Sequence, residues 1–198
     1  MNNNFWLWFL ENEDALFNID DDATQIFHAM SFELQKVDES ISIEFGPVDS
    51  VGIREIVVTA GGIRSAFPAV EKLVKSAPLM KRWRITKFRQ REVNLLDVKF
   101  GEKEIKAEDV HYAIVRDNNP TRLGILLFFE NYHETQNDIF GNIGYLFLDQ
   151  AIGEYEVETR VGVIDMFDRT SKYFSSARPL IELGEHFDEV VSELEDLH

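Results

Sequence analysis

The chain has 198 residues, and we expect it to form a single domain over residues 1–198 with a substantial buried core. Its 36 acidic and 20 basic residues give a formal net charge of −16, which disfavours nucleic acid and anionic membranes as partners unless a basic patch acts locally. Cysteine is absent, which excludes disulfides and thiolate sites and fits a reducing cytoplasm. No apolar run reaches the length of a membrane span, so we expect a cytoplasmic protein that is not inserted in a membrane.

The N-terminal part of the chain predicts a helical hairpin over about residues 2–37. In a helix over residues 2–17, apolar side chains recur on two adjacent stripes. Three aspartates at residues 20–22 supply an N-cap and a favourable negative charge for a second helix. In that helix three apolar side chains recur at helical spacing: Phe27, Met30 and Leu34.

The stretch FWLWF at residues 5–9 holds two of the three tryptophans. Each aromatic ring can bury a large area, so we expect this cluster to pack in the core. Core packing is favoured because acidic residues follow at once and suit the outer side of the same helix. The alternative is an exposed apolar face from Phe5 to Phe9 that joins copies into a homo-oligomer.

The middle of the chain predicts two strands, a helix and then further strands. SISIEF and IREIVVTA have the alternation of half-buried strands and form a probable hairpin. A helix follows the glycine pair at residues 61–62 and stops at Pro78. Residues 83–116 alternate loosely, which predicts three or four antiparallel strands.

The C-terminal part predicts a buried strand and two amphipathic helices. LGILLFF at residues 123–129 is apolar on both faces, as in a central strand covered on each side. A helix over about residues 134–151 is followed by a strand in EVETRVGVID. The last helix turns its apolar side chains inward and seven carboxylates between residues 182 and 196 toward water. This order predicts an α+β fold: a largely antiparallel mixed sheet with an N-terminal helical hairpin and flanking helices.

Charge is distributed unevenly along the chain. Residues 1–50 carry eleven acids and one lysine, whereas residues 81–91 carry six basic residues and no acid. With Trp83 and Phe88 between them, the basic side chains could contact a nucleic-acid backbone while the rings stack on bases. The plainer interpretation is that they pair with acids of the same chain, and the strong negative charge favours it. The candidate binding residues of this segment are Arg82, Arg84, Arg89 and Arg91.

The acidic N-terminal third and the acidic last helix suggest a docking face for a basic protein. Complementary charge would speed the encounter and select the partner. The candidate binding residues of the N-terminal third are Glu11, Glu13 and Asp14. The alternative is that these acids only keep helix faces soluble. Our leading hypothesis is a non-enzymatic interaction or regulatory protein, comparable to an inhibitor or an immunity protein.

Two other acidic clusters allow the alternative of a small metal-assisted hydrolase. Glu130, His133 and Glu134 follow a buried strand, where catalytic groups often lie. Glu154, Glu156 and Glu158 would line one face of a strand, and Glu154 is a candidate binding residue. The sequence lacks HExxH and GxSxG, and TAGGIRS lacks the spacing of phosphate-binding loops. We therefore assign no catalytic residue, no metal ligand and no cofactor.

Four stretches also carry a resemblance: FWLWFLENEDALF, TAGGIRSAFPAVEKLVKSAPLMKRW, ITKFRQR and LDQAIGEYEVET. Together they resemble a family of uncharacterised bacterial cytosolic proteins with an N-terminal FWxWF motif, a central AP…W…FRxR segment and a late GEY motif. The resemblance covers most of the chain. It implies a common fold and brings no reaction, substrate or catalytic residue with it.

Overall fold

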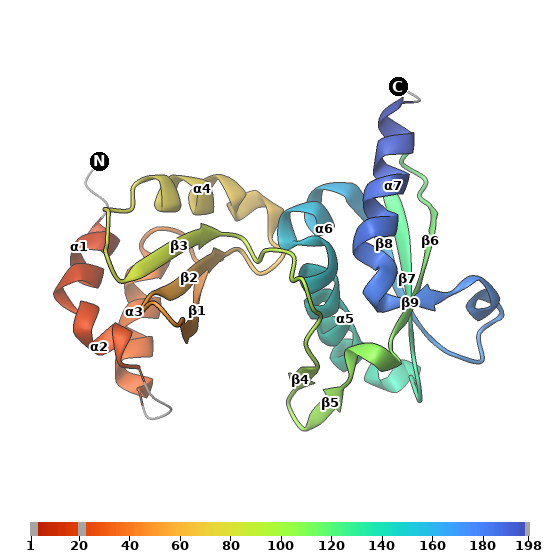
Figure 1. Cartoon of the computed structure of the whole chain (residues 1–198), viewed down its shortest axis with the longest axis horizontal. Helices are drawn as coiled ribbons and strands as arrows, with labels where there is room; N and C mark the ends of the chain where they lie inside the picture. The colour runs from red at the N-terminus through yellow and green to blue at the C-terminus, as the bar shows by residue number, and fades with distance from the viewer. Residues whose placement is uncertain (1–3, 20–22, 197–198) are drawn as a thin grey trace. The chain divides into compact units, whose positions relative to one another are not determined.

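The computed structural model describes residues 4–19 and 23–196, and its contacts fall into two compact units, residues 1–89 and residues 90–198 (Figure 1). Each unit has a large hydrophobic core made of its own residues. The chain therefore has two large cores, and the expectation of a single domain over residues 1–198 stays a prediction. The division lies in residues 88–97, which form neither helix nor strand and expose Val93 and Leu96.

The first unit consists of four α-helices and a three-stranded sheet within the described residues. The helices are α1 (Asn4–Glu11), α2 (Glu13–Phe17), α3 (Thr24–Gln35) and α4 (Phe67–Lys75), and the strands are β1 (Ser42–Val48), β2 (Arg54–Thr59) and β3 (Trp83–Lys87). The strand order is β1-β2-β3. β1 and β2 pair antiparallel, whereas β3 runs parallel to β2.

One face of this sheet carries the core, and the helices α1, α3 and α4 contribute to it. The core strand residues are Ile43, Phe45, Ile56, Val58, Trp83 and Ile85, which share one face by strand alternation. The aromatic cluster packs here: Phe5, Trp6 and Phe9 are at most 3% exposed, and the indole Nε1 of Trp6 donates to the carbonyl oxygen of Leu73 at 2.9 Å. The expected core packing is confirmed, so these three rings do not form an exposed face for self-association.

The predicted helix over residues 2–17 is divided at Asn12, which lies between α1 and α2. The Asn12 side chain donates to the carbonyl oxygen of Trp8 at 2.8 Å. Such side-chain bonds compete with regular helical bonding at the end of a helix. The helical hairpin is present, because α1 packs against α3. The predicted cap at residues 20–22 lies outside the described residues.

The second unit contains three α-helices, a four-stranded sheet and a small hairpin within the described residues. The helices are α5 (Asn137–Ile152), α6 (Glu154–Arg160) and α7 (Leu183–Asp196), the hairpin is β4 (Val98–Phe100) and β5 (Lys103–Ile105), and the sheet strands are β6 (His111–Arg116), β7 (Leu123–Phe129), β8 (Val161–Asp168) and β9 (Arg178–Pro179). The strand order is β8-β7-β6-β9. Only the pair β7 and β8 is parallel in this sheet.

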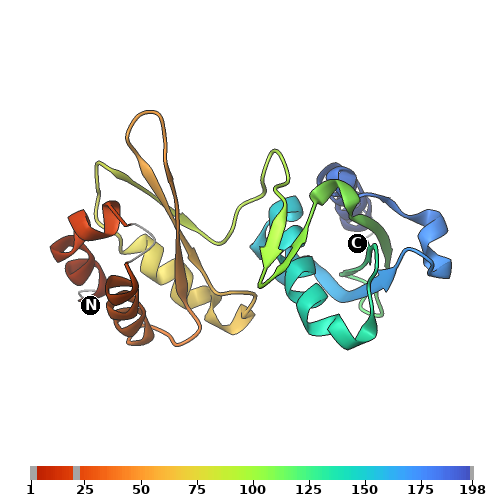
Figure 2. The same cartoon turned by 90° about the horizontal axis from the view of Figure 1, so that it is seen from below.

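Both faces of β7 are covered, which confirms the expected central strand. All seven of its residues are buried. One face packs with α5 and α7 in the main core, and the other packs in a smaller cluster that includes Phe128, Phe167 and Phe174. Figure 2 shows α5 and the strands of this unit from below.

Two predictions about strands were wrong in part. The segment 83–116 forms four strands, and β4, β5 and β6 pair antiparallel as expected, but β3 is parallel to β2 because α4 carries the chain back across the sheet between them. The strand expected in EVETRVGVID begins only at Val161, and Glu154–Arg160 form α6 instead. Glu154 and Val157 are both buried and lie three residues apart, a spacing that places them on one side of a helix but on opposite faces of a strand.

The α+β class with a largely antiparallel mixed sheet is confirmed. Both units also share one order of elements: a strand, an antiparallel strand, a helical connection and a strand parallel to the second. In each case the second strand lies in the centre. None of the helices in residues 4–19 and 23–196 combines the length and the apolar character needed to cross a membrane.

Candidate functional site

The four arginines of the predicted basic segment all pair with acids of their own unit. Arg82 lies 3.1 Å from Glu13 and 2.6 Å from Asp14, and Arg84 lies 3.5 Å from Asp49. The remaining two pairs are Arg89 with Glu44 at 2.6 Å and Arg91 with Asp188 at 2.7 Å. The plainer interpretation of this segment therefore fits the geometry, and little unpaired positive charge remains there for a phosphate backbone.

Glu13 and Asp14 belong to a closed cluster at the start of β3. The carboxylate of Glu13 also accepts from the indole Nε1 of Trp83 at 3.1 Å, and the guanidinium of Arg82 lies 4.6 Å from the ring centre of Phe17. The hydrogen bond to Asp14 raises the pKa of Arg82. Glu11 is exposed and forms no ion pair with any described residue. Most of the described acidic charge of α2 is thus neutralised within the unit.

Glu154 does not lie on a solvent-facing strand. It occupies the first turn of α6 and is 0% exposed. Glu156 and Glu158 follow on the same short helix, and Glu156 pairs with Arg160 at 3.1 Å. The expected row of three carboxylates on one strand face is therefore wrong, because a helix turns successive even positions to different sides.

The seven acids of residues 182–196, which are those of α7 together with Glu182 just before it, divide into two groups. Three pair with arginines: Glu182 with Arg178 at 2.8 Å, Asp188 with Arg91 at 2.7 Å, and Glu195 with Arg160 at 2.7 Å. The other four recur every three or four residues and share one exposed face of the helix: Glu185, Glu189, Glu193 and Asp196. We call these four residues the α7 stripe. Within the described chain none of the four forms a salt bridge.

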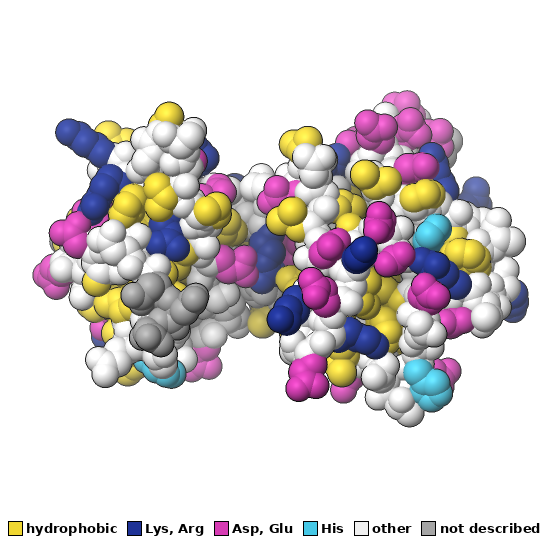
Figure 3. Space-filling model, turned by 60° about the horizontal axis from the view of Figure 1, so that its bottom comes forward, with side chains coloured by type: hydrophobic (Ala, Val, Ile, Leu, Met, Phe, Trp, Pro, Cys, Tyr) yellow, Lys and Arg dark blue, Asp and Glu magenta, His cyan; other side chains and the backbone are white. Residues whose placement is uncertain are grey.

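Local electrostatics oppose this arrangement. Like charges four residues apart on a helix destabilise it by about 0.2–0.5 kcal/mol per pair, as do acids near the negative end of the helix dipole. The last turn of α7 contains no basic residue. The helix is held instead by its opposite face, where Leu183 and Phe187 are buried in the core of the second unit. Figure 3 shows acidic side chains gathered at the top of this unit, where α7 ends.

The alternative catalytic cluster lies at the carboxyl ends of the parallel strands β7 and β8. His133, Glu134, Asp168 and Ser171 line a cavity of about 340 Å³ there. His133 Nδ1 lies 2.9 Å from the hydroxyl of Thr135. The backbone N–H and the hydroxyl of Thr170 donate hydrogen bonds to Asp168 and lower the pKa of this carboxyl. The turn therefore favours the ionised form of Asp168. Glu130 lies outside this lining and pairs with Arg169 at 3.6 Å.

Three polar side chains of this cavity, His133, Asp168 and Ser171, each form a hydrogen bond with a residue two positions along the chain. No hydrogen bond joins His133 to Ser171 or Asp168 in the described part of the chain, so no nucleophile and base are paired. No group of three or more His, Asp or Glu side chains among the described residues could hold a metal ion.

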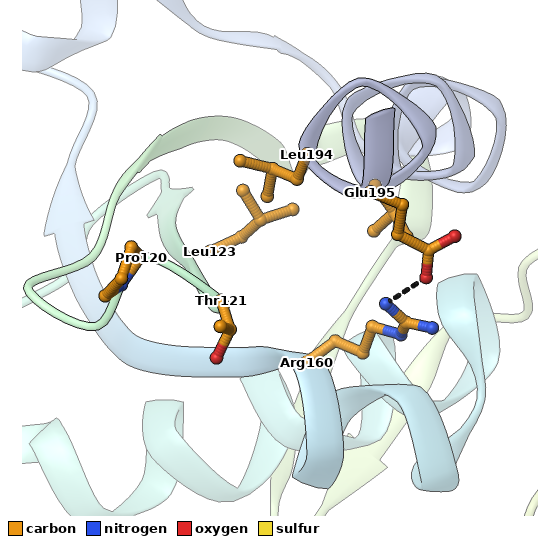
Figure 4. Close-up of a pocket in the computed structure, with 7 residues that line it drawn as sticks. Pro120, Thr121, Leu123, Arg160, Leu194 and Glu195 are labelled. Carbon is orange, nitrogen blue, oxygen red and sulfur yellow. Dashed lines mark ion pairs between the residues drawn. The ribbon is translucent and has the colours of Figure 1, made fainter. Parts of the chain in front are cut away.

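A second cavity, of about 170 Å³, lies beside α7 in the same unit (Figure 4). Its apolar wall includes Leu123, Val191 and Leu194. Figure 4 shows Pro120 and Thr121 on one side and the ion pair of Arg160 with Glu195 on the other. The acidic face of α7 could be predicted from the sequence, but this cavity could not, because its lining comes from a turn, the start of a strand and two helices. Only tertiary structure brings them together.

Comparison of the chain with protein-family models, with curated proteins and with solved structures gives no match. The resemblance described from sequence motifs therefore stays a prediction.

Proposed function

We propose that this protein is a non-enzymatic binding protein whose α7 stripe engages a basic protein partner, in the manner of an inhibitor or an immunity protein. One observation carries the proposal: the stripe keeps four exposed carboxylates without a salt bridge in the described chain, although arginines neutralise other acids on the same helix. An arrangement that costs local stability is expected where a surface serves binding.

The charge of the whole chain supports the same partner class. With 36 acidic and 20 basic residues, the surface attracts cationic proteins from a distance and repels polyanions. The four arginines of residues 82–91 are each within 3.5 Å of a carboxylate, which disfavours nucleic acid as the partner. The hydrolase alternative is disfavoured by the absence of a paired nucleophile and base among the described residues.

The test compares two variants that have the same net charge. The stripe variant carries Glu185→Gln, Glu189→Gln, Glu193→Gln and Asp196→Asn. The control variant carries Glu92→Gln, Glu102→Gln, Glu104→Gln and Asp138→Asn, which are exposed acids elsewhere in the second unit. Each variant changes the formal charge from −16 to −16 + 4 = −12.

Immobilised wild-type protein and both variants are exposed to lysate of the source cell at low and high salt, and the retained proteins are quantified. We expect wild type and control to retain the same basic protein, with loss at high salt because screening shortens the range of the field. The stripe variant should associate with that purified protein about tenfold more slowly. Equal binding by the stripe and control variants would show that the position of these acids is irrelevant.

A further inference from the structure

The cavity beside α7 combines an apolar wall with a charged rim. Leu123 is only 4% exposed, and Val191 and Leu194 pack against the same core. The volume of about 170 Å³ is of the size that accommodates one small apolar group, since a cavity of about 150 Å³ holds a benzene ring. The wall thus suits an aliphatic chain of a few carbon atoms.

The charged part of the rim is an ion pair between Arg160 and Glu195. Arg160 at the end of α6 contacts two carboxylates, Glu195 at 2.7 Å and Glu156 at 3.1 Å. The hydrogen bond that Arg160 donates to Glu195 raises the pKa of Arg160, so the guanidinium stays charged. Glu156 does not line the cavity, and the guanidinium of Arg122 lies 3.5 Å from the carbonyl oxygen of Val161, the residue after Arg160. The rim itself is therefore close to neutral, and the excess acid lies on the rest of α7. The side chains of Arg160, Glu195 and Glu156 are more than a third exposed, so they can exchange partners at modest cost.

From this combination we propose that the cavity binds the side chain of a lysine from the basic protein partner. The methylene groups would lie along Leu123, Val191 and Leu194, and the ammonium group would share Glu195 with Arg160. Arg160 would keep Glu156, so neither cation is left without a carboxylate. Lysine side chains commonly place an aliphatic stem on an apolar surface while the charged head stays at its edge. This inference rests on the proposed function and assigns one anchor point within it.

The same geometry argues against an anionic ligand. A carboxylate or phosphate group at the rim would approach Glu195, while the guanidinium of Arg160 is already engaged by two carboxylates. An arginine side chain fits less well than lysine, because its planar group would need the position that Arg160 occupies beside Glu195 (Figure 4).

The test uses a minimal probe, N-acetyl-lysine N-methylamide, titrated into the ¹⁵N-labelled full chain and followed by NMR. We expect saturable shifts of the backbone amides of Thr121, Leu123 and Leu194. The norleucine compound, which has a methyl group in place of the ammonium, should bind more weakly, because it loses the interaction with Glu195. Equal shifts with both compounds would overturn the proposal and indicate a merely apolar cavity.

Two matched variants separate this cavity from the α7 stripe. Glu195→Gln removes one carboxylate of the rim and should weaken binding of the lysine compound about two- to fivefold, as expected for one partly exposed charge. Glu193→Gln removes the same charge from the same helix but does not line the cavity, so binding should be unchanged. An unchanged affinity in Glu195→Gln contradicts the proposed role of the rim.

The two proposals fail in different ways. If the stripe variant keeps the protein partner while the lysine compound still binds wild type at this cavity, the proposed function is wrong as stated. If the stripe variant loses the partner while the lysine compound gives no saturable shift, the function stands and the lysine anchor is wrong.

Discussion

At the scale of single residues, the contact between Tyr112 and His186 links the stability of the second unit to pH. Tyr112 is fully buried, and its hydroxyl lies 2.8 Å from Nδ1 of His186 on α7. Burial raises the pKa of Tyr112 to about 12 and lowers the pKa of His186. The charged groups that act on His186 are Arg178, Glu182, Glu189 and Glu193, and they do not reverse this direction.

We predict that this histidine makes the second unit less stable in mild acid. Because the pKa of His186 is lower in the folded chain than its ordinary value of 6.5, the unfolded state binds the proton more readily. The free energy of unfolding therefore falls as the pH drops through 6.5, until the folded form is protonated too. In His186→Gln this part of the pH dependence should vanish, as measured by urea unfolding followed by circular dichroism.

A histidine on the surface provides the control. His133→Gln changes an exposed side chain in the same unit and should keep the wild-type pH profile. If His186→Gln unfolds with the same pH profile as wild type, the buried contact does not govern the acid response.

At the scale of elements, the turn from α5 to α6 depends on one glycine. Gly153 ends α5 with φ 87° and ψ 142°, a backbone conformation that side chains with a Cβ seldom adopt. It permits α6 to start at once and bury Val157. The helix predicted from the sequence ends at about residue 151, which agrees with the end of α5 at Ile152, but a strand was expected where α6 follows.

We predict that Gly153→Ala destabilises the second unit by about 1–3 kcal/mol through backbone strain. Gly141→Ala is the matched control, because Gly141 lies inside α5 and a Cβ there meets no atom within 4 Å. Alanine at that position should leave stability unchanged or raise it by up to about 1 kcal/mol. Equal effects of the two substitutions in thermal unfolding would rule out strain at Gly153.

At the scale of the whole molecule, the two cores can be observed separately. All three tryptophans, Trp6, Trp8 and Trp83, belong to the first unit and pack in or against its core. Tryptophan fluorescence therefore reports on unfolding of residues 1–89, whereas far-ultraviolet circular dichroism reports on both units.

We predict that a cavity in one core leaves the other core unaffected. Phe147→Ala empties a fully buried position of the second unit and should cost about 3–5 kcal/mol there. The circular dichroism transition should shift to lower urea while the tryptophan transition stays in place. Leu73→Ala, in the first core, should shift the tryptophan transition. A tryptophan transition that moves equally in both variants would mean that the two units unfold as one.

The sequence by itself determined the type and place of most elements. Helical and alternating apolar patterns depend on neighbours within about one turn or one strand. The sequence therefore predicted the burial of Phe5, Trp6 and Phe9, the doubly covered strand β7 and the two faces of α7. The class of fold followed from the order of these elements.

Tertiary structure alone decided which distant side chains meet. Glu13 and Arg82 lie 69 residues apart in the chain. Their ion pair neutralises two side chains that the sequence pattern assigns to two different binding surfaces. Packing between elements likewise decides the direction of β3, the division into two cores and the cavity beside α7. Local periodicity predicts which face of an element is apolar, but not which other element packs against that face. The acids of the α7 stripe can be distinguished from the paired acids of the same helix only when the ion pairs of the folded chain are known.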